Sequence, residues 1–254
     1  MTGLPQEFLA RPIAHRGLHD TRDGRVENSR AALQAAIDHG YGIEIDVQLT
    51  RDDAAVVFHD YELERLTEGV GRVRTRTVSD LSTLKLKGGN ETVPSLREIL
   101  DLVAGRVPLL VEIKDQDGAL GEEVGTLEAA VAKEFDGYSG PLAVMSFNPN
   151  SVSAMQALAP EVPRGLVTDA FYADVWNAPR ERLEKLAGIV DYDRVGASFI
   201  SHNRQFLSMP VVSELKSRGV PILCWTIRTP EEEAAARAFA DNVTFEGYLP
   251  PVLS

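Results

Sequence analysis

Short apolar segments alternate with helical segments along the whole of this chain, and this alternation constrains its fold more than any other feature. Strands separated by helices pair in parallel, because each helix carries the chain back to the edge of the sheet where the next strand begins. The pattern predicts eight strands that each precede a helix, starting near residues 12, 43, 109, 142, 164, 196, 222 and 243. Eight such units in 254 residues are typical of one α/β fold, the closed (β/α)8 TIM-type barrel.

A doubly wound open sheet is the competing architecture for such a pattern. It usually carries a glycine-rich phosphate-binding turn after its first strand, whereas the corresponding turn here is HRGLHD at residues 15–20. No linker or low-complexity segment interrupts the sequence, so we expect residues 1–254 to form a single barrel domain. The alternation lapses over residues 60–93, which are rich in Arg, Thr and Gly. We interpret this segment as a short insertion after the second strand.

The spacing of apolar residues also locates the expected helices. Gly40 ends the first of them, while Pro94 and Ser95 begin the next, as glycine and proline commonly do at helix ends. The expected helices cover residues 27–39, 96–104, 119–135, 149–158, 179–190, 211–219 and 229–240.

The charge and the cysteine content exclude several classes of protein. The chain has 38 acidic and 26 basic residues, a formal net charge of −12, whereas nucleic acids and anionic membranes attract cationic surfaces. Cys224 is the only cysteine, so no intramolecular disulfide can form. No segment approaches the roughly 20 apolar residues of a membrane span, and the N-terminus lacks a signal-peptide pattern. We expect a cytoplasmic protein that binds no nucleic acid and associates with no membrane stably.

Ionisable residues concentrate at the ends of the predicted strands, where barrels of this kind carry their functional groups. The first three strand–helix units hold most of them. The candidate site residues, in chain order, are His15, Arg16, Glu44, Asp46, His59, Glu112 and Lys114.

Glu44 and Asp46 are two residues apart in a strand, so their side chains point to the same side of the sheet. Two carboxylates inside a barrel repel each other and are poorly hydrated, which is costly without a compensating cation. Glu112, at another strand end, is the expected third ligand of a divalent metal ion. Three carboxylates favour a hard ion, Mg²⁺ or Ca²⁺. The alternative is a structural network in which Arg16 and Lys114 pair with these acids.

Arg16 and Lys114 would form a cationic wall beside this acidic cluster. Arginine offers a two-pronged donor to phosphate oxygens and lysine a point charge, so the pair suits a phosphate ester. Alternatively, Arg16 only neutralises a loop carboxylate such as Glu27.

His15 and His59 are the two histidines at predicted strand ends. Imidazoles titrate near neutral pH, so we predict that these two act as acid and base on opposite sides of a displacement at phosphorus. We interpret His19, His39 and His202 as packed or surface residues.

Several residues at later strand ends give weaker signals. Phe147, Trp225 and Glu246 are candidates for the substrate pocket, although Trp225 would suit the core equally well. We interpret Ser146 as a hydrogen-bonding or packing residue and Cys224 as a core residue.

Taken together, these residues resemble the glycerophosphodiester phosphodiesterase family, in particular its bacterial cytoplasmic members. The segments that carry the resemblance are IAHRG at 13–17, ENS at 27–29, GIEIDVQLTRD at 42–52, VVFHD at 56–60, VPSLREIL at 93–100, VEIK at 111–114, SFNP at 146–149 and CWTI at 224–227.

The resemblance implies a metal-dependent barrel that hydrolyses glycerophosphodiesters to glycerol 3-phosphate and an alcohol, with one divalent ion, Mg²⁺ or Ca²⁺, as its cofactor. It also implies roles for individual residues. These are His15 and His59 as the acid and base, Arg16 and Lys114 on phosphate, and Glu44, Asp46 and Glu112 on the metal.

Three positions depart from the family's pattern. Arg228 stands where Asn is frequent, Glu246 lies near the usual acid of the last strand, and Leu110 stands where Asn often precedes the metal-binding Glu. These departures spare the metal and histidine positions and bear on the pocket for the leaving alcohol.

Two alternative functions share this barrel. Hydrolysis of lysophospholipid or sphingophospholipid head groups needs an apolar rim, and residues 60–93 are polar and basic. A non-catalytic phosphate-binding barrel is the other alternative, and the intact motifs argue against it.

Overall fold

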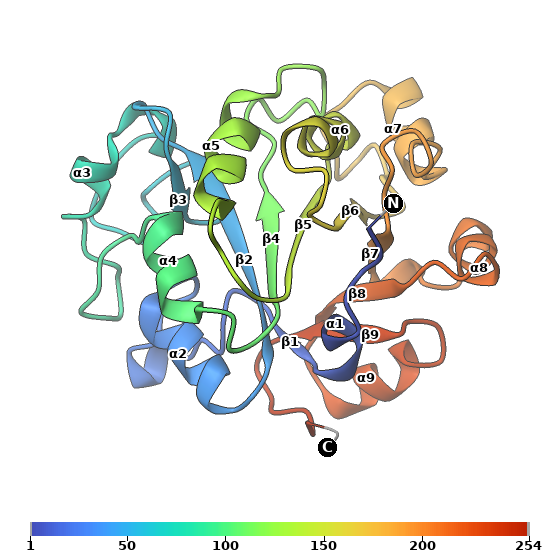
Figure 1. Ribbon diagram of the computed structural model, residues 1–254, viewed down its shortest axis with the longest axis horizontal. Helices are drawn as coiled ribbons and strands as arrows, with labels where there is room; N and C mark the ends of the chain where they lie inside the picture. Colours follow the sequence, from blue (N-terminus) through green and yellow to red (C-terminus); the bar gives the residue numbers. More distant parts are fainter. Residues whose placement is uncertain (1, 253–254) are drawn as a thin grey trace.

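The structure is a computed structural model that describes residues 2–252. Its parallel strands form a closed barrel with helices on the outside (Figure 1). Strand β1 (Ile13–Ala14) is hydrogen-bonded to both β2 (Gly42–Leu49) and β9 (Asn242–Phe245), and these two pairings close the barrel. The predicted (β/α)8 TIM-type fold is therefore confirmed, and the open doubly wound sheet is excluded.

The other barrel strands follow one another around the sheet in chain order. They are β4 (Leu109–Ile113), β5 (Leu142–Ser146), β6 (Arg164–Thr168), β7 (Phe199–Asn203) and β8 (Ile222–Ile227). The short strand β3 (Ala55–Val57) pairs antiparallel with the end of β2 and lies outside the barrel order. Each predicted barrel strand is present, and the one expected near residue 196 begins at Phe199.

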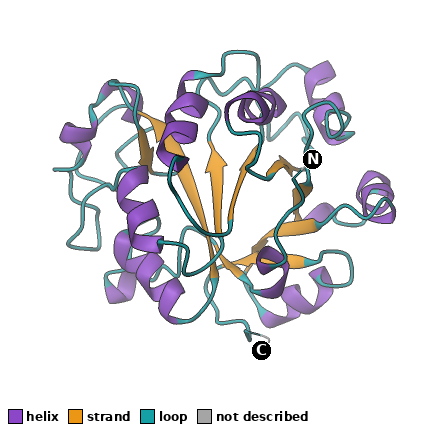
Figure 2. Ribbon diagram, viewed as in Figure 1, coloured by secondary structure: helices purple, strands orange, loops and turns teal. Residues whose placement is uncertain are grey.

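Helices follow most of the strands and surround the barrel (Figure 2). They are α1 (Glu7–Ala10), α2 (Arg30–Asp38), α3 (Val78–Leu81), α4 (Leu96–Val103), α5 (Thr126–Phe135), α6 (Pro149–Leu158), α7 (Arg180–Ala187), α8 (Pro210–Ser217) and α9 (Pro230–Ala236). Short 3-10 turns occur at Thr21–Asp23, Val73–Thr75 and Arg204–Phe206.

The helix expected over residues 119–135 is shorter than predicted, because α5 begins only at Thr126. Glycine costs about 1 kcal/mol more than alanine inside a helix, and glycines occur at 118, 121 and 125. Gly125 caps the helix with φ 123°, a conformation that glycine adopts far more readily than other residues. Residues 115–125 consequently form a loop at the carboxyl end of β4.

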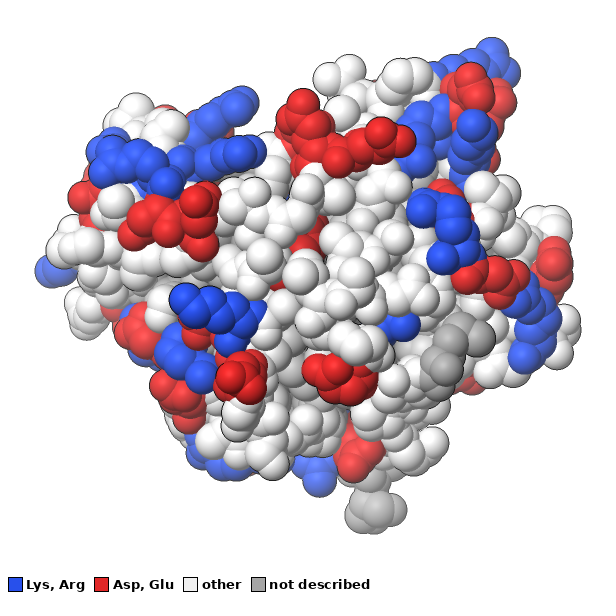
Figure 3. Space-filling model, turned by 45° about the horizontal axis from the view of Figure 1, so that its top comes forward, with Lys and Arg blue, Asp and Glu red and all other residues white. Residues whose placement is uncertain are grey.

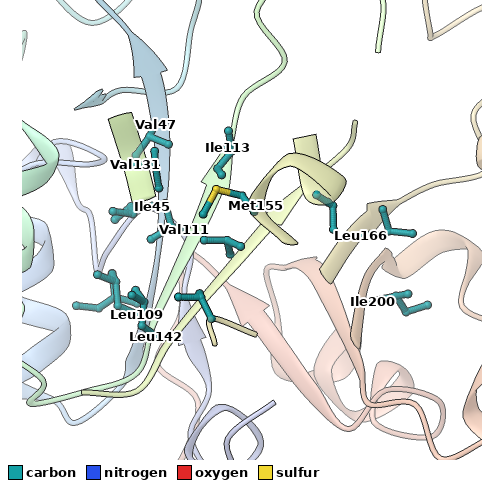
Figure 4. Packing of buried hydrophobic residues seen from close by; sticks show 14 of the residues in the cluster. Ile45, Val47, Leu109, Val111, Ile113, Val131, Leu142, Met155, Leu166 and Ile200 are labelled. Atoms are coloured by element: carbon teal, nitrogen blue, oxygen red, sulfur yellow. The ribbon is translucent and has the colours of Figure 1, made fainter. Parts of the chain in front are cut away.

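Side chains along each strand point alternately into the barrel and outward, and this divides the core into two layers. Inward-facing residues such as Leu110, Met145 and Phe199 fill the inside of the barrel, where Phe8 of α1 joins them. Their neighbours in sequence point outward and pack against the helices. Figure 4 shows this outer layer, in which Val131 of α5 and other helix residues cover the strands.

The segment 60–93 packs around an apolar cluster of its own, beside β3. This cluster includes Phe58, Leu63 and Leu81, together with Val56 of β3. A short helix, α3, lies within this segment. The insertion is therefore a compact unit attached to the end of β2 and β3, near the carboxyl edge of the barrel.

None of the helices within residues 2–252 is both long enough and apolar enough to cross a bilayer.

Candidate active site

The carboxyl ends of the first strands bring three acidic side chains together. Glu44 and Asp46 lie on β2, and Asp46 faces Glu112 of β4 directly in the strand register. Oxygen atoms of Glu44, Asp46 and Glu112 all lie within 4.8 Å of one another, and all three residues are buried. The arrangement follows from the alternation of the strands, which turns these positions inward while Ile45 and Val111 point to the outer layer.

Basic side chains compensate part of this buried charge. Lys114 Nζ lies 2.6 Å from Glu112 Oε1 and 2.8 Å from Asp46 Oδ1, and Arg16 Nε lies 3.3 Å from Asp46 Oδ2. Burial opposes ionisation of Asp46, but the charges of Lys114, His59 and Arg16 outweigh it and hold its pKa below the usual value. The ion pairs of the alternative structural network are therefore present.

Glu44 is the carboxylate of the cluster that takes part in none of these ion pairs. Its Oε2 accepts a hydrogen bond of 3.0 Å from the Arg16 backbone N–H, but within residues 2–252 no group donates a hydrogen bond to its buried Oε1. Burial, followed by repulsion from Asp46 and Glu112, raises its pKa well above the usual value. A divalent cation would relieve both the repulsion and the missing bond, so the three carboxylates fit a hard metal ion.

The turn after β1 places Arg16 by means of an unusual backbone. Arg16 has φ 55° and Gly17 has φ 78°, both in the left-handed region. A Cβ on residue 17 would lie 2.8 Å from the carbonyl carbon of Ala32 in α2, so only glycine fits this close approach. Arg16 Nη1 lies 2.7 Å from Glu27 Oε1. The alternative contact between Arg16 and Glu27 is therefore confirmed, and Arg16 makes it in addition to its contact with Asp46.

Residues 27–29 connect this turn to the acidic cluster, a role that the sequence reasoning did not assign. Asn28 donates from Nδ2 to Asp46 Oδ2 at 2.9 Å, and its Oδ1 accepts from the Asp46 backbone N–H at 3.3 Å. Ser29 accepts from the backbone N–H of Ala32 and thereby caps α2. The ENS segment was the available signal, because it carries part of the family resemblance.

His15 is held by a carboxylate from the last strand. Its Nδ1 lies 2.6 Å from Glu246 Oε2, and Arg228 contacts the other oxygen of Glu246 at 2.7–2.8 Å. Burial lowers the pKa of His15, while the hydrogen bond from His15 and the nearby imidazole of His19 hold the pKa of Glu246 below its usual value. His19, expected to be a packed or surface residue, lies 3.6 Å from the same carboxylate and so borders the site.

His59 has an equivalent partner in the next residue. Its Nδ1 lies 2.7 Å from Asp60 Oδ1, and Arg65 contacts both Asp60, at 2.5 Å, and Glu27, at 2.8 Å. Burial raises the pKa of Asp60, but hydrogen bonds from His59 and Arg65 outweigh this effect and lower it. In both histidines the partner of Nδ1 is a carboxylate. An ionised carboxylate can accept hydrogen bonds but cannot donate them, so Nδ1 carries the hydrogen and Nε2 is free for other contacts.

Most of the predicted site residues line one cavity at this edge of the barrel. It is lined by His15, Arg16, Glu44, His59, Glu112, Lys114, Phe147, Trp225, Thr226 and Arg228, among others. Asp46 lies beneath it in contact with Arg16 and Lys114, and Glu246 lies behind His15.

The aromatic candidates form one wall of the cavity. Trp225 packs edge-on against Phe147 at 5.5 Å between ring centroids and donates from Nε1 to the Ser201 carbonyl at 2.9 Å. Trp225 packs against the apolar cluster inside the barrel and also lines the cavity.

Four residues that the sequence analysis interprets as packing, surface or core residues do not line the cavity. Ser146 donates to the Ile113 carbonyl at 2.7 Å, Cys224 is fully buried in the core, and His39 lies at the end of α2. His202 is buried and shares a hydrogen bond of 2.7 Å with Thr168, and burial lowers its pKa to about 4.

The outer surface carries charges of both signs. In Figure 3, clusters of Lys and Arg lie beside clusters of Asp and Glu, with broad uncharged areas between them.

Comparison with known proteins shows which family has a matching sequence. The family model described as the glycerophosphoryl diester phosphodiesterase family matches residues 15–244. A glycerophosphodiester phosphodiesterase of Caldanaerobacter subterraneus is 30% identical over 243 residues, which cover 91% of this chain and 91% of that protein.

Solved structures agree with this match. A phosphodiesterase of Oleispira antarctica, in complex with the product sn-glycerol-3-phosphate, is 26% identical with a TM-score of 0.75 over 95% of this chain and 94% of that one. A putative glycerophosphoryl diester phosphodiesterase of Silicibacter pomeroyi, at 21% identity, shares the fold with a TM-score of 0.78 over 94% of this chain and 93% of that one.

The closed barrel, with its ionisable side chains gathered at the carboxyl ends of the strands, is that of a TIM-barrel enzyme. The chain belongs to the glycerophosphoryl diester phosphodiesterase family, and it is an enzyme that hydrolyses phosphodiesters.

Proposed function

We propose that this enzyme hydrolyses glycerophosphodiesters to glycerol 3-phosphate and an alcohol, with a divalent metal ion and two histidines. The observation that carries the proposal is the single cavity lined by both imidazoles, by Arg16 and Lys114, and by two carboxylates of the acidic cluster. The related Oleispira antarctica enzyme was solved with sn-glycerol-3-phosphate as its product, which supports the same product here.

Glu44, Asp46 and Glu112 would hold the ion. Their carboxylates lie within 4.8 Å of one another, and the missing donor at Glu44 Oε1 supports an additional cation in the cluster. An all-oxygen donor set favours Mg²⁺ or Ca²⁺ over softer metals. When bound, such an ion supplies positive charge that stabilises the phosphoryl oxygens as the reaction proceeds.

Arg16 and Lys114 would bind the phosphate group. Both line the cavity and both already contact the acidic cluster, so their cationic groups lie next to the place where a phosphodiester would sit. Arg16 is oriented by Glu27 at 2.7 Å, which fixes its guanidinium against the cavity wall. Fixed charges of this kind stabilise a transition state without reorganising during the reaction.

His15 and His59 would move the protons. Because a carboxylate occupies Nδ1 of each ring, Nε2 is the atom that exchanges a proton with the substrate. One Nε2 takes the proton from the attacking hydroxyl, and the other, protonated beforehand, gives a proton to the departing alkoxide oxygen. Glu246 and Asp60 act as positioning residues that hold the rings and their tautomers.

A panel of glycerophosphodiesters tests the proposal, with phosphomonoester release measured in the presence of Mg²⁺, Ca²⁺ or EDTA. We expect glycerol 3-phosphate to form with at least one of the two ions and to cease in EDTA. Turnover that persists in EDTA would contradict the metal dependence. Binding of the diesters without any turnover would instead favour the non-catalytic phosphate-binding barrel.

A further inference from the structure

A second cavity opens beside the catalytic cavity. Its volume, about 520 Å³, lies in the range of small-molecule sites. The residues that line both cavities are His59, Glu112, Lys114 and Phe147. The second cavity adds Tyr61, Leu120 and Trp176, and most of its exposed wall is apolar. We call it the apolar groove. Because the two cavities share a wall, a molecule whose phosphate lies at the histidines can extend into the groove.

Three separate loops build the apolar groove. Tyr61 follows His59 and Asp60 at the start of the insertion, Leu120 lies in the loop between β4 and α5, and Trp176 lies in the loop between β6 and α7. The insertion itself is polar and basic, so the apolar rim that a lipid-like substrate needs is provided mainly by the two other loops.

The indole of Trp176 is fixed in place. Its Nε1 donates to Asp169 Oδ2 at 3.0 Å, and its ring centroid lies 5.0 Å from that of Phe147 and 4.8 Å from that of Phe171. Asp169 is buried and also accepts from Asn203 Nδ2 at 3.1 Å. This network holds an aromatic wall at the edge of the site rather than burying the indole in the core.

Leu120 is fixed in a similar way. It has φ 54°, and its backbone N–H donates to Asp115 Oδ2 at 3.0 Å. Its side chain packs with Phe171 and Leu183, so the leucine belongs to a small apolar cluster that underlies the groove. Apolar contact along a preformed wall is the feature by which small-molecule sites bind hydrocarbon.

Besides Glu112, three acidic residues also line the groove, and each of them already has a partner. Asp60 pairs with His59 and Arg65, Glu62 pairs with Arg72 at 3.0 Å, and Asp115 accepts from Asn148 Nδ2 at 2.7 Å. Their charges are compensated or hydrogen-bonded, so the groove favours an apolar occupant over a cationic one.

We propose that the apolar groove binds a short alkyl or acyl chain attached to the phosphodiester, so that the enzyme prefers amphiphilic glycerophosphodiesters to fully polar ones. The inference rests on the proposed function and names the substrate class for the same site. The chain has two sources. It can be the leaving alcohol itself, which keeps glycerol 3-phosphate as the product, or it can be attached to the glycerol, in which case the product is the corresponding acylated glycerol phosphate.

Three substrates distinguish these sources, each used as a monomer and with the metal ion that supports turnover. They are glycerophosphoethanolamine, its hexanoyl ester on glycerol, and the glycerophosphodiester of hexanol. Phosphomonoester formation followed by ³¹P NMR gives kcat/KM for all three. We expect one of the two chain-bearing substrates to exceed glycerophosphoethanolamine by about tenfold or more, since each buried methylene favours binding. The faster one identifies the arm that carries the chain.

Variants connect this preference to the groove. Trp176→Ala should reduce the ratio of kcat/KM values to about threefold or less. Tyr172→Ser is the matched control, because Tyr172 lies in the same loop but packs against Phe206 at 5.4 Å and does not line the groove. It should leave the ratio unchanged. If Trp176→Ala does not fold, Tyr61→Ser at an exposed position takes its place, with the same expected reduction.

Two results would overturn the inference while leaving the proposed function intact. One is a wild-type ratio near one for both chain-bearing substrates, and the other is a ratio that neither Trp176→Ala nor Tyr61→Ser changes. A preference for glycerophosphocholine over glycerophosphoethanolamine that depends on Trp176, without any chain preference, would assign the groove to a quaternary ammonium instead. Failure to hydrolyse all of these diesters would count against the proposed function itself.

Discussion

At the scale of single residues, the two histidines of the site have matching surroundings. His15 is held by Glu246 and, behind it, by Arg228. His59 is held by Asp60 and, behind it, by Arg65. A carboxylate fixes the ring and its tautomer, and an arginine keeps that carboxylate ionised. Two imidazoles prepared in the same way suit a reaction in which one removes a proton and the other donates one.

Removing either imidazole tests this role. We expect His15→Ala and His59→Ala each to reduce kcat by about 10²- to 10⁴-fold, the usual contribution of general acid–base catalysis. His39→Ala, at the end of α2, is the control and should keep wild-type kcat. Circular dichroism and thermal unfolding establish that the variants fold. Near wild-type turnover by either active-site variant would show that the assigned roles are wrong.

The sequence predicted which residues meet at the cavity better than it predicted their hydrogen-bond partners. Strand ends and spacing led to His15 and Glu44, because a strand fixes where its side chains point. The positions of His19 and Asn28 depend on the path of the loop after β1, which no periodic pattern describes. Arg228 and Glu246 are two separate departures from the family's pattern in the sequence, and in the structure they form one ion pair.

At the scale of secondary-structure elements, the turn after β1 determines where the site lies relative to α2. Gly17 lies against the backbone of Ala32 in α2, and Ser29 caps the same helix. Glu27, two residues before Ser29, contacts Arg16. The HRG and ENS segments therefore act together, one by close packing and the other by hydrogen bonds. These contacts give a physical reason for two motifs that the family resemblance alone leaves unexplained.

Gly17→Ala should be unusually destabilising. We expect it to lower the free energy of unfolding by about 2–5 kcal/mol, since the left-handed φ and the backbone clash both oppose a Cβ. Gly118→Ala is a matched control, because Gly118 has a similar φ of 73° but an added Cβ there would meet no atom within 4 Å among the described residues. It should cost only about 1–2 kcal/mol. Urea unfolding measures both values, and equal losses would contradict the role assigned to the close approach.

Element boundaries were predicted well where caps are strong and poorly where glycines interrupt a pattern. The helix over 149–158 matches α6, because Asn148 caps it and Pro149 begins it. The helix over 119–135 lost its first seven residues to the loop that carries Leu120. The apolar groove could not be predicted from the sequence for the same reason, because it depends on how the loops 115–125 and 169–179 fold.

At the scale of the whole molecule, the closed barrel brings distant parts of the chain to one cavity. His15 and Glu246 are separated by 231 positions and lie 2.6 Å apart, because β1 pairs with β9. The prediction of eight alternating units was sufficient for this closure.

The paired carboxylates should also affect stability toward acid. The pKa of Glu246 is lower in the folded chain than its usual value of 4.5, as is that of Asp60 relative to 3.8. A depressed pKa stabilises the fold above the unfolded-state value and loses that contribution as the pH falls. We therefore expect the free energy of unfolding to fall steadily below about pH 4.5.

Glu246→Gln should make this fall shallower, because glutamine does not titrate. Glu68→Gln, at an exposed position of the insertion, is the control and should retain the wild-type slope. Urea unfolding between about pH 6 and pH 3 measures the slopes, which should differ by on the order of one titrating group. Equal slopes for wild type and Glu246→Gln would contradict the linkage.

The most direct test of the metal site is calorimetric titration of the purified enzyme with Mg²⁺ and with Ca²⁺, compared among wild type, Glu44→Gln and the control Glu68→Gln. We predict one ion per chain for wild type and for Glu68→Gln, and an affinity at least about tenfold weaker for Glu44→Gln, because the Oε1 of Glu44 accepts no hydrogen bond from the described residues. If wild type binds neither ion, or if Glu44→Gln binds as tightly as wild type, the three carboxylates are a salt-bridged network and the proposed metal centre is wrong.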